Sequence, residues 1–343
     1  MKATPLLSAL TTRAKAKAHT RTPTPTCPCG AATLTDRPDG TVVRHADTVA
    51  KAHAPDTPPT ELTARLSTAA ALPGILLPPL SPTPVDLHGR LVTFWPYGTP
   101  VDPEDPDAAP WEEAATLLAR LHRTPAPPGL PPMRGPAKAA RAIARLQATT
   151  PQPATEPVMR AWAALPPWAR ADAPMPDLPT PLPPTPGTAH APGTAHAPHT
   201  AHAPHTPHPT LCHGDLHLGQ LVRHPSPDGP WLLIDVDDLG IGTPTWDLAR
   251  PAAWYACGLL PPDEWTRFLT AYRTAGGPAV PAEGDPWPAL DVAARALTVQ
   301  TAALAIVKAT AADRPLDEVQ QAVVDACDRM GAVPPELTHG HPK

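Results

Sequence analysis

Proline makes up 56 of the 343 residues, about 16%, roughly three times its usual share. Because proline lacks a backbone N–H, it ends helices and is excluded from central strands, so the sequence predicts short elements separated by long loops. The densest stretch, 174–209, repeats the hexapeptide Gly-Thr-Ala-His-Ala-Pro at 187–192 and 193–198, with no large apolar residue after Leu182. We expect this insertion to be disordered, because it buries too little apolar surface to offset its ordering entropy.

Charge and cysteine usage narrow the class of protein. The chain has 27 basic and 32 acidic residues and a formal net charge of -5, which argues against a nucleic-acid partner. Its five cysteines are too few and too scattered for a disulfide framework, so a reducing compartment is the default. No apolar run approaches the ~18 residues of a membrane span, and the N-terminus lacks the apolar stretch of a secretory signal. We therefore expect a cytoplasmic protein with neither a membrane nor a nucleic-acid partner.

The patterning divides the chain into three parts. Residues 1–30 combine a short basic stretch with Thr-Pro repeats, and we expect a flexible arm there. Residues 31–98 contain β-favouring segments joined by turn residues and one helical segment beginning at Thr60, which predicts an antiparallel meander with one helix. Residues 99–335 are dominated by helical periodicity, as in the apolar positions of the segment 111–122.

Two runs in the C-terminal part carry residues suited to phosphoryl transfer. They are 211–220, which reads LCHGDLHLGQ, and 231–249, which reads WLLIDVDDLGIGTPTWDLA. Asp215 and Gln220 have the spacing of the protein-kinase catalytic Asp and its metal-binding amide, and Asp235 closes an apolar run further on. A carboxylate such as Asp215 can orient an acceptor hydroxyl and take its proton. Asp235 and Gln220 offer the oxygen ligands that Mg²⁺ prefers.

These runs resemble the aminoglycoside phosphotransferase family of kinase-like enzymes. That family carries His-Gly-Asp-x-His-x-x-Asn, then Ile-Asp, then Gly-Asp-Pro-x-x-Asp-Leu-Ala. Residues 213–217 match the first element in full, and Ile234-Asp235 follows at the expected interval. Residues 242–249 match the third element except at Thr243. The resemblance implies an α+β, two-lobed protein-kinase-like fold with a small antiparallel β N-lobe that includes one helix, and a larger, mostly helical C-lobe.

The resemblance also implies cofactors and residue roles. It implies ATP and Mg²⁺ as cofactors, a hydroxylated small molecule as acceptor, and structural support of the catalytic loop by His213, His217 and Asp247. Gln220 stands where most members have Asn. A Gln at this position also occurs in a related branch similar to the maltokinases, which phosphorylate a sugar hydroxyl.

The nucleotide lobe is assigned on the same basis. Lys51 sits as the third-strand lysine of kinases does, and Glu61 on the following helix is placed to pair with it. The plain alternative is a surface lysine, with Glu61 merely favouring the N-terminus of its helix. Phe94, Trp95 and Tyr97 fall in the expected hinge between the lobes, whose backbone would meet the adenine ring.

Several polar groups outside the motifs admit a functional and a plain interpretation. The acidic segment 101–113 would attract a polycationic aminoglycoside, although a solvated loop is favoured. Lys138, Arg141 and Arg145 share one face of a predicted helix, where a solvated surface is favoured over a phosphate site. Asp237 could join a metal shell or be a solvated turn residue, and the second is favoured.

Two further groups consist of residue types that bind metals. Cys27-Pro28-Cys29 has no second ligand pair nearby in the sequence, which disfavours zinc there. A flexible tract lacks the outer hydrogen bonds of a selective site, so weak adventitious binding is favoured for the histidines of the insertion. They are His190, His196, His199, His202, His205 and His208.

The leading hypothesis is an ATP- and Mg²⁺-dependent small-molecule O-phosphotransferase acting on a hydroxyl of an antibiotic, a sugar or a related metabolite. Its rival is a catalytically inactive nucleotide-binding module, suggested by Gln220 and by the lack of a Gly-x-Gly phosphate loop. A protein kinase is disfavoured, because the sequence has no Ala-Pro-Glu segment and no recognisable activation loop.

Overall fold

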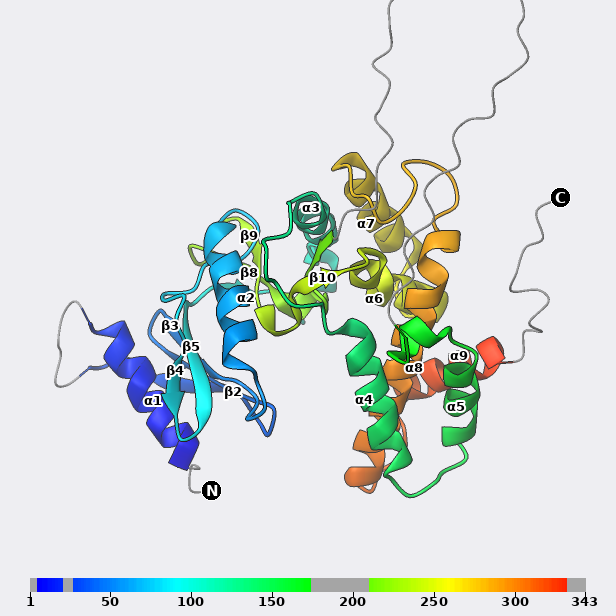
Figure 1. Cartoon of the computed structure of the whole chain (residues 1–343), viewed down its shortest axis with the longest axis horizontal. Helices are drawn as coiled ribbons and strands as arrows, with labels where there is room; N and C mark the ends of the chain where they lie inside the picture. The colour runs from blue at the N-terminus through cyan, green and yellow to red at the C-terminus, as the bar shows by residue number, and fades with distance from the viewer. Residues whose placement is uncertain (1–4, 21–26, 174–209, 332–343) are drawn as a thin grey trace, which may run out of the picture.

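The structure, a computed structural model, describes residues 5–20, 27–173 and 210–331. The insertion at 174–209, with its expected disorder and its six histidines, lies outside the described residues. The described chain forms two lobes, a β-rich N-terminal lobe and a mostly helical C-terminal lobe (Figure 1).

The N-lobe is built on a five-stranded antiparallel sheet in the order β1-β2-β3-β5-β4. Strand alternation sends side chains to opposite faces, and helix α2 (Pro59–Ala71) covers one face by packing Leu62 and Leu66 near Trp95. The strands are β1 (Ala31–Arg37), β2 (Gly40–His45), β3 (Thr48–Ala52), β4 (Val85–Leu87) and β5 (Arg90–Pro96).

The opposite face of this sheet is covered by a helix that sequence patterning missed. Helix α1 (Pro5–Ala18) packs Leu10 and Ala14, both fully buried, against Val43 and Phe94 (Figure 1). The prediction of a flexible arm over 1–30 is therefore wrong for the residues of α1. Apolar side chains four apart form a stripe on one helix face, and the sheet offers a matching apolar face.

The C-lobe is organised around the long helix α8 (Trp287–Ala311), which packs against α4, α6 and α9. Short paired strands connect the C-lobe to the N-lobe. The other helices are α3 (Trp111–His122), α4 (Gly135–Gln147), α5 (Thr155–Ala163), α6 (Thr245–Ala256), α7 (Pro262–Thr274) and α9 (Glu318–Gly331). The short strands are β6 (Thr99–Pro100), β7 (Thr210–Cys212), β8 (Leu221–Arg223), β9 (Trp231–Leu233) and β10 (Gly240–Gly242), paired as β6-β8-β9 and β10-β7.

Within the described residues, α8 is the one helix whose length and mean hydropathy, 1.5, would suffice to cross a membrane. Its most apolar window is 67% buried inside the protein, as in the core helix of a globular domain. The apolar character of α8 is therefore accounted for by packing within the C-lobe.

Candidate active site

Backbone pairing brings the two sequence motifs together. The loop that carries Asp215 follows β7, and Gln220 lies just before β8. Because β8 pairs with β9, the N–H of Ile234 donates to the carbonyl oxygen of Gln220 at 2.9 Å. Gln220 therefore lies beside Asp235, the residue that follows Ile234.

Gly214 allows the loop that carries Asp215 to turn tightly. Its φ is +86°, a region that side-chain-bearing residues rarely adopt, and a Cβ there would collide with the carbonyl oxygen of Asp238. The glycine thus brings Asp215 close to the turn Val236–Asp238, which follows Asp235. This close approach joins the two motifs into one site.

The buried carboxylate of Asp247, on α6, holds this loop through hydrogen bonds. Asp247 is 1% exposed, and its two oxygens accept from the N–H groups of His213 and Gly214, each at 2.6 Å. His122 Nε2 lies 2.9 Å from the same carboxylate. His213 Nε2 in turn lies 2.8 Å from the carbonyl oxygen of Ile234. Asp247 and His213 together link α6, the loop and the end of β9.

The hydrogen-bonded network around Asp247 extends to His122 and Tyr272, a pair that sequence reasoning missed. His122 Nδ1 lies 2.7 Å from the hydroxyl of Tyr272, which accepts from the N–H of Ala279 at 3.0 Å. Burial raises the pKa of Tyr272, so the phenol stays protonated. No local pattern points to this pair, because its members are 150 residues apart.

Asp215 lies between two cations. Lys138 Nζ is 2.8 Å from one carboxylate oxygen, and an Arg250 guanidinium nitrogen is 2.8 Å from the other. Burial alone would raise the pKa of Asp215, but the charges of Lys138 and Arg250 outweigh it and hold the pKa below its ordinary value. Asp215 is therefore an ionised hydrogen-bond acceptor at neutral pH.

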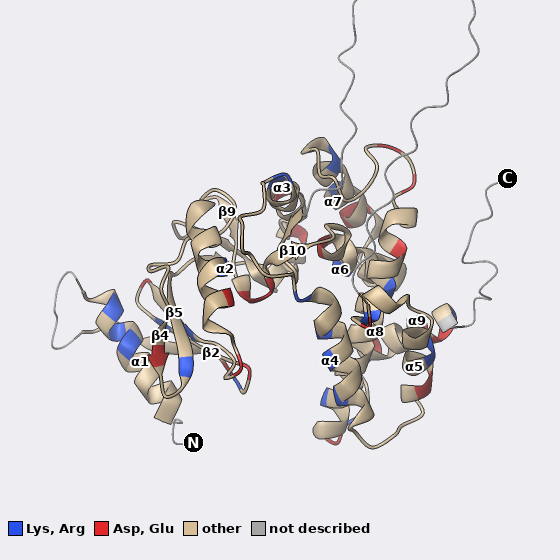
Figure 2. Cartoon of the chain, in the orientation of Figure 1, with Lys and Arg blue, Asp and Glu red and all other residues tan. Residues whose placement is uncertain are grey.

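Lys138 corrects the expectation of a purely solvated face on α4. Arg141 and Arg145 are exposed, and the basic residues of α4 are blue in Figure 2. Lys138 instead bridges Asp215 and Asp238, with Nζ 2.7 Å from the Asp238 carboxylate. The charges of these two acids raise its pKa against the lowering effect of burial.

Gly135 explains how α4 reaches the site. A Cβ at this position would collide with the indole of Trp246 on α6, so only glycine permits this approach of the two helices. Lys138 lies about one turn further along α4. Arg250 lies about one turn past Asp247 on α6, and its Nε also donates to the carbonyl oxygen of Leu216 at 3.0 Å.

Lys51 is at the site but does not pair with Glu61. Its Nζ lies 2.7 Å from Asp235 and 3.0 Å from Asp237. Glu61 instead pairs with Arg65 one turn along α2, at 3.1 Å. The predicted Lys51–Glu61 pair is therefore absent from this structure, because the two carboxylates already satisfy the ammonium group. Their charges raise the pKa of Lys51 although burial opposes this.

Asp237 is likewise not the solvated turn residue that was favoured. Its carboxylate contacts Lys51 and lies 2.8 Å from Nδ1 of the fully buried His53. Burial would raise the pKa of Asp237, but the charges of Lys51 and His53 lower it well below the ordinary value. His53 Nε2 lies 2.8 Å from the hydroxyl of Thr93, which accepts from Trp95 Nε1 at 2.9 Å. A chain of polar contacts thus runs from Trp95 through Thr93, His53 and Asp237 to Lys51.

The side chains of the three aromatic hinge candidates lie in different surroundings. Phe94 packs its side chain against α1, on the sheet face opposite Trp95, and the expected contact of its backbone with the adenine ring stays a prediction. Tyr97 contacts Arg44, whose guanidinium carbon is 3.3 Å from the ring centroid. Trp95 is the one of the three whose side chain joins the polar chain that leads to Lys51.

The donor set beside Asp235 suits a hard cation. Asp235 adopts a left-handed backbone conformation with φ of 64°, and its Oδ1 accepts from the N–H of Asp237 at 3.3 Å. The Gln220 carboxamide has no hydrogen-bond partner among the described residues. Carboxylate and carboxamide oxygens are the ligands that Mg²⁺ takes. Asp235 and Gln220 therefore fit the magnesium site that the sequence predicts.

His217 is neutral in the folded protein. Burial, reinforced by the charge of Arg250, lowers its pKa to about 4, and its Nδ1 accepts from the N–H of Gly219 at 3.1 Å. The unfolded chain gains a proton near the ordinary value of 6.5, and the folded chain gains it only near 4. Stability should therefore fall as the pH drops from 6.5 to 4.

We expect His217→Asn to reduce this pH dependence, because Asn does not titrate yet can accept the Gly219 N–H. Urea unfolding of both proteins across this pH range measures the effect. His88→Asn, at an exposed site, is the control and should keep the wild-type slope. Identical slopes in the wild type and His217→Asn would contradict the prediction.

The fold has solved relatives. A choline/ethanolamine kinase family protein from Mesorhizobium loti is 17% identical, covers 94% of this chain and 96% of its own, and has a TM-score of 0.53. A thermostable mutant of the aminoglycoside phosphotransferase APH(4)-Ia is 14% identical, with coverages of 88% and 95% and a TM-score of 0.53. Spectinomycin phosphotransferase APH(9)-Ia, solved with ADP and spectinomycin, is 12% identical, with coverages of 89% and 89% and a TM-score of 0.50. A comparison with curated protein sequences gives no match.

These structures define the fold as that of kinase-like phosphotransferases, and the predicted two-lobed α+β fold is confirmed. The model of the phosphotransferase enzyme family matches residues 34–287, which is 254 of the 343 residues. The chain therefore belongs to this family, as the motifs indicated. The match includes both sequence motifs and the strand that carries Lys51.

Proposed function

We propose that the protein is a kinase that uses Mg²⁺ and ATP to phosphorylate a hydroxyl group of a small molecule. The observation that carries the proposal is the joining of two charged clusters by one short turn. Lys51 in the N-lobe contacts Asp235 and Asp237, and Lys138 in the C-lobe contacts Asp238 and Asp215. Phosphoryl transfer requires positioning and charge neutralisation between two such lobes.

In the proposed reaction Asp215 accepts a hydrogen bond from the acceptor hydroxyl and orients its oxygen toward the γ-phosphorus. The new O–P bond forms as the bond between the γ-phosphorus and the bridging oxygen breaks. ADP leaves with that electron pair, and the hydroxyl proton passes to the Asp215 carboxylate. Lys51 would neutralise nucleotide phosphate charge. Mg²⁺ held by Asp235 and Gln220 would supply further neutralisation of that charge.

The surroundings of Asp215 favour a neutral acceptor. The side chains near it include Lys138, Arg250, Trp246 and Gln300. Lys138 and Arg250 are already paired with Asp215 and Asp238, so this part of the site has no excess negative charge to attract a polycation, whereas a sugar-like hydroxyl can use the polar side chains. In the acidic segment 101–113, Asp102 and Asp105 accept hydrogen bonds from the N–H groups of Glu104 and Ala108, as in the solvated loop that the sequence favours. Among antibiotics, sugars and related metabolites, we therefore favour a neutral polyhydroxylated acceptor.

The test is ADP release with Mg·ATP in the presence of pooled acceptors. The pools are neutral sugars and cyclitols, hydroxylated antibiotics without amines, aminoglycosides, and amino alcohols. Release with a neutral pool is expected. Release confined to aminoglycosides would contradict the acceptor preference but not the kinase. ATP binding without release in any pool would favour the rival, an inactive nucleotide-binding module.

The metal role of Asp235 gives a further prediction. Asp235→Asn should weaken binding of Mg·ATP at least about tenfold, because it removes an anionic metal ligand. Isothermal titration calorimetry with a non-hydrolysable analogue measures this, and Asp228→Asn in the exposed loop before β9 is the control. Unchanged affinity in Asp235→Asn would remove Asp235 from the proposed metal site.

A further inference from the structure

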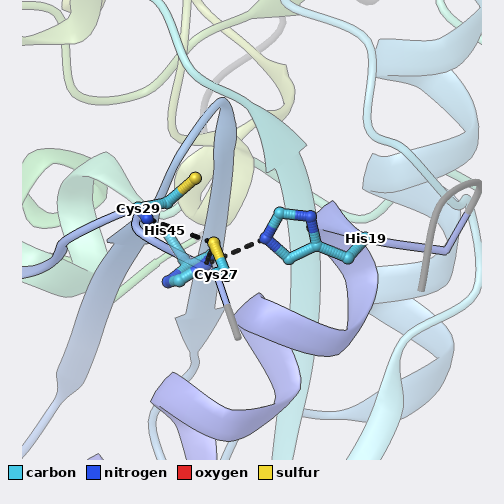
Figure 3. Close-up of side chains that lie close together, drawn as sticks. All are labelled: His19, Cys27, Cys29 and His45. Atoms are coloured by element: carbon cyan, nitrogen blue, oxygen red, sulfur yellow. Dashed lines mark hydrogen bonds between the residues drawn. The ribbon is translucent and has the colours of Figure 1, made fainter. Parts of the chain in front are cut away.

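A second cluster of metal-ligating side chains lies on the N-lobe, away from the candidate active site. His19 follows the end of α1, His45 ends β2, and Cys27 and Cys29 precede β1 (Figure 3). One ligand atom from each of these four residues lies within 4.8 Å of all the others. The second ligand pair that Cys27-Pro28-Cys29 lacks in the sequence is thus supplied by the fold.

Two of the contact distances match those of a tetrahedral metal site. His19 Nε2 is 3.2 Å from His45 Nε2, and Cys27 Sγ is 3.5 Å from His45 Nε2. With zinc–nitrogen bonds of ~2.0–2.1 Å and zinc–sulfur bonds of ~2.3 Å, tetrahedral geometry places nitrogens ~3.3 Å apart and a nitrogen ~3.6 Å from a sulfur. Both observed separations lie within about 0.2 Å of these values.

Hydrogen bonding alone leaves this cluster poorly satisfied. His45 is 3% exposed, and its Nδ1 has no hydrogen-bond partner among the described residues. Its Nε2 faces both the second imidazole nitrogen and the Cys27 sulfur, and one ring nitrogen cannot satisfy two such neighbours through a single lone pair or proton. A cation among them would accept a lone pair from each. The Cys29 N–H, which donates to Cys27 Sγ at 3.2 Å, would stabilise a thiolate there.

We infer that His19, Cys27, Cys29 and His45 form a structural zinc site. Two thiolates and two imidazoles in tetrahedral arrangement select zinc among the common divalent ions, and four protein ligands leave no open position for catalysis. The site joins the C-terminal end of α1 to β2 and to the segment before β1. Zinc would thereby fix α1 on the sheet face that carries Phe94, opposite the face that carries Lys51.

The other described group of possible ligands does not compete as a metal site. It comprises His122, Cys212 and Asp247, all buried. Both Asp247 oxygens and both His122 nitrogens already have the partners described above. His122 and Asp247 belong to the hydrogen-bonded network that holds the loop carrying Asp215.

The test is metal content and Co²⁺ spectroscopy of the full chain. We expect zinc close to one equivalent per chain after purification without chelators. The Co²⁺-substituted protein should show thiolate-to-cobalt charge transfer and the intense visible bands of tetrahedral Co²⁺. The charge-transfer band separates this site from the histidines of the insertion, because 174–209 contains no cysteine.

Variants assign the ligands. Cys27→Ser and His19→Asn should lose the charge-transfer band or shift it strongly, and should lose most of the bound zinc. Cys257→Ser and His88→Asn, outside the cluster, are the matched controls and should retain both. Because a core variant could fail to fold, Cys29→Ser at an exposed position provides a second test, as does zinc release from the wild type by a thiol-blocking mercurial. An octahedral Co²⁺ spectrum, zinc unaffected by Cys27→Ser, or a Cys27–Cys29 disulfide in protein freshly isolated under reducing conditions would overturn the inference.

Discussion

Asp215→Asn is expected to lower kcat by about 10²- to 10⁴-fold, while the affinity for Mg·ATP changes little. The amide keeps the shape of the carboxylate but cannot take the acceptor proton. It also leaves Lys138 and Arg250 without their shared anion, which lies 2.8 Å from each. Acceptor-dependent ADP release measures turnover, and calorimetry measures nucleotide affinity.

The control for this experiment is Asp228→Asn, which makes the same chemical change at an exposed position. It should keep wild-type turnover. A kcat within about tenfold of wild type for Asp215→Asn would mean that the acceptor proton leaves by another route. A large loss of nucleotide affinity would instead place Asp215 among the nucleotide ligands. Either result would overturn its assignment as the base.

The largest expected effect on stability is that of Asp247→Asn, about 3–5 kcal/mol. The fully buried carboxylate accepts two backbone N–H groups at 2.6 Å and contacts His122. An amide presents N–H to at least one of these donors, so a buried donor is left without an acceptor. Urea unfolding monitored by tryptophan fluorescence measures the loss.

Asp263→Asn is a matched control, because Asp263 also lies in the first turn of a helix and is exposed. It removes the same favourable charge at a helix N-terminus, worth at most about 1 kcal/mol. Equal losses for the two variants would show that Asp247 acts through the helix dipole rather than through its buried hydrogen bonds.

The sequence motifs, and the family that they resemble, predicted the fold and the members of the candidate site that lie within the motifs. Asp215, Gln220 and Asp235 are separated by short, fixed intervals, so one hairpin and one loop suffice to bring them together. Lys51 was placed near them by its resemblance to the third-strand lysine of kinases, and its Nζ lies 2.7 Å from Asp235. The two-lobed fold was implied by the family that the motifs resemble, and the change of apolar period near residue 98 indicated where the lobes meet.

The corrected residues depend on contacts that no local pattern encodes. Lys138 and Asp215 meet only because Gly135 lets α4 approach Trp246, so the sequence shows three equivalent basic residues where the structure shows one engaged. The directions of Phe94 and Trp95 can, by contrast, be predicted locally, since the two are consecutive in one strand and their side chains must point to opposite faces.

The ion pairs of the candidate site have a consequence for ligand preference. Three cations meet four carboxylates, namely Lys51, Lys138 and Arg250 against Asp215, Asp235, Asp237 and Asp238. With every group ionised, the centre carries one surplus negative charge. Metal-free ATP would add several more, whereas a divalent cation offsets part of the nucleotide charge. For the proposed reaction, the charge of the unliganded centre therefore disfavours the binding of metal-free ATP. Metal and nucleotide should bind with positive cooperativity.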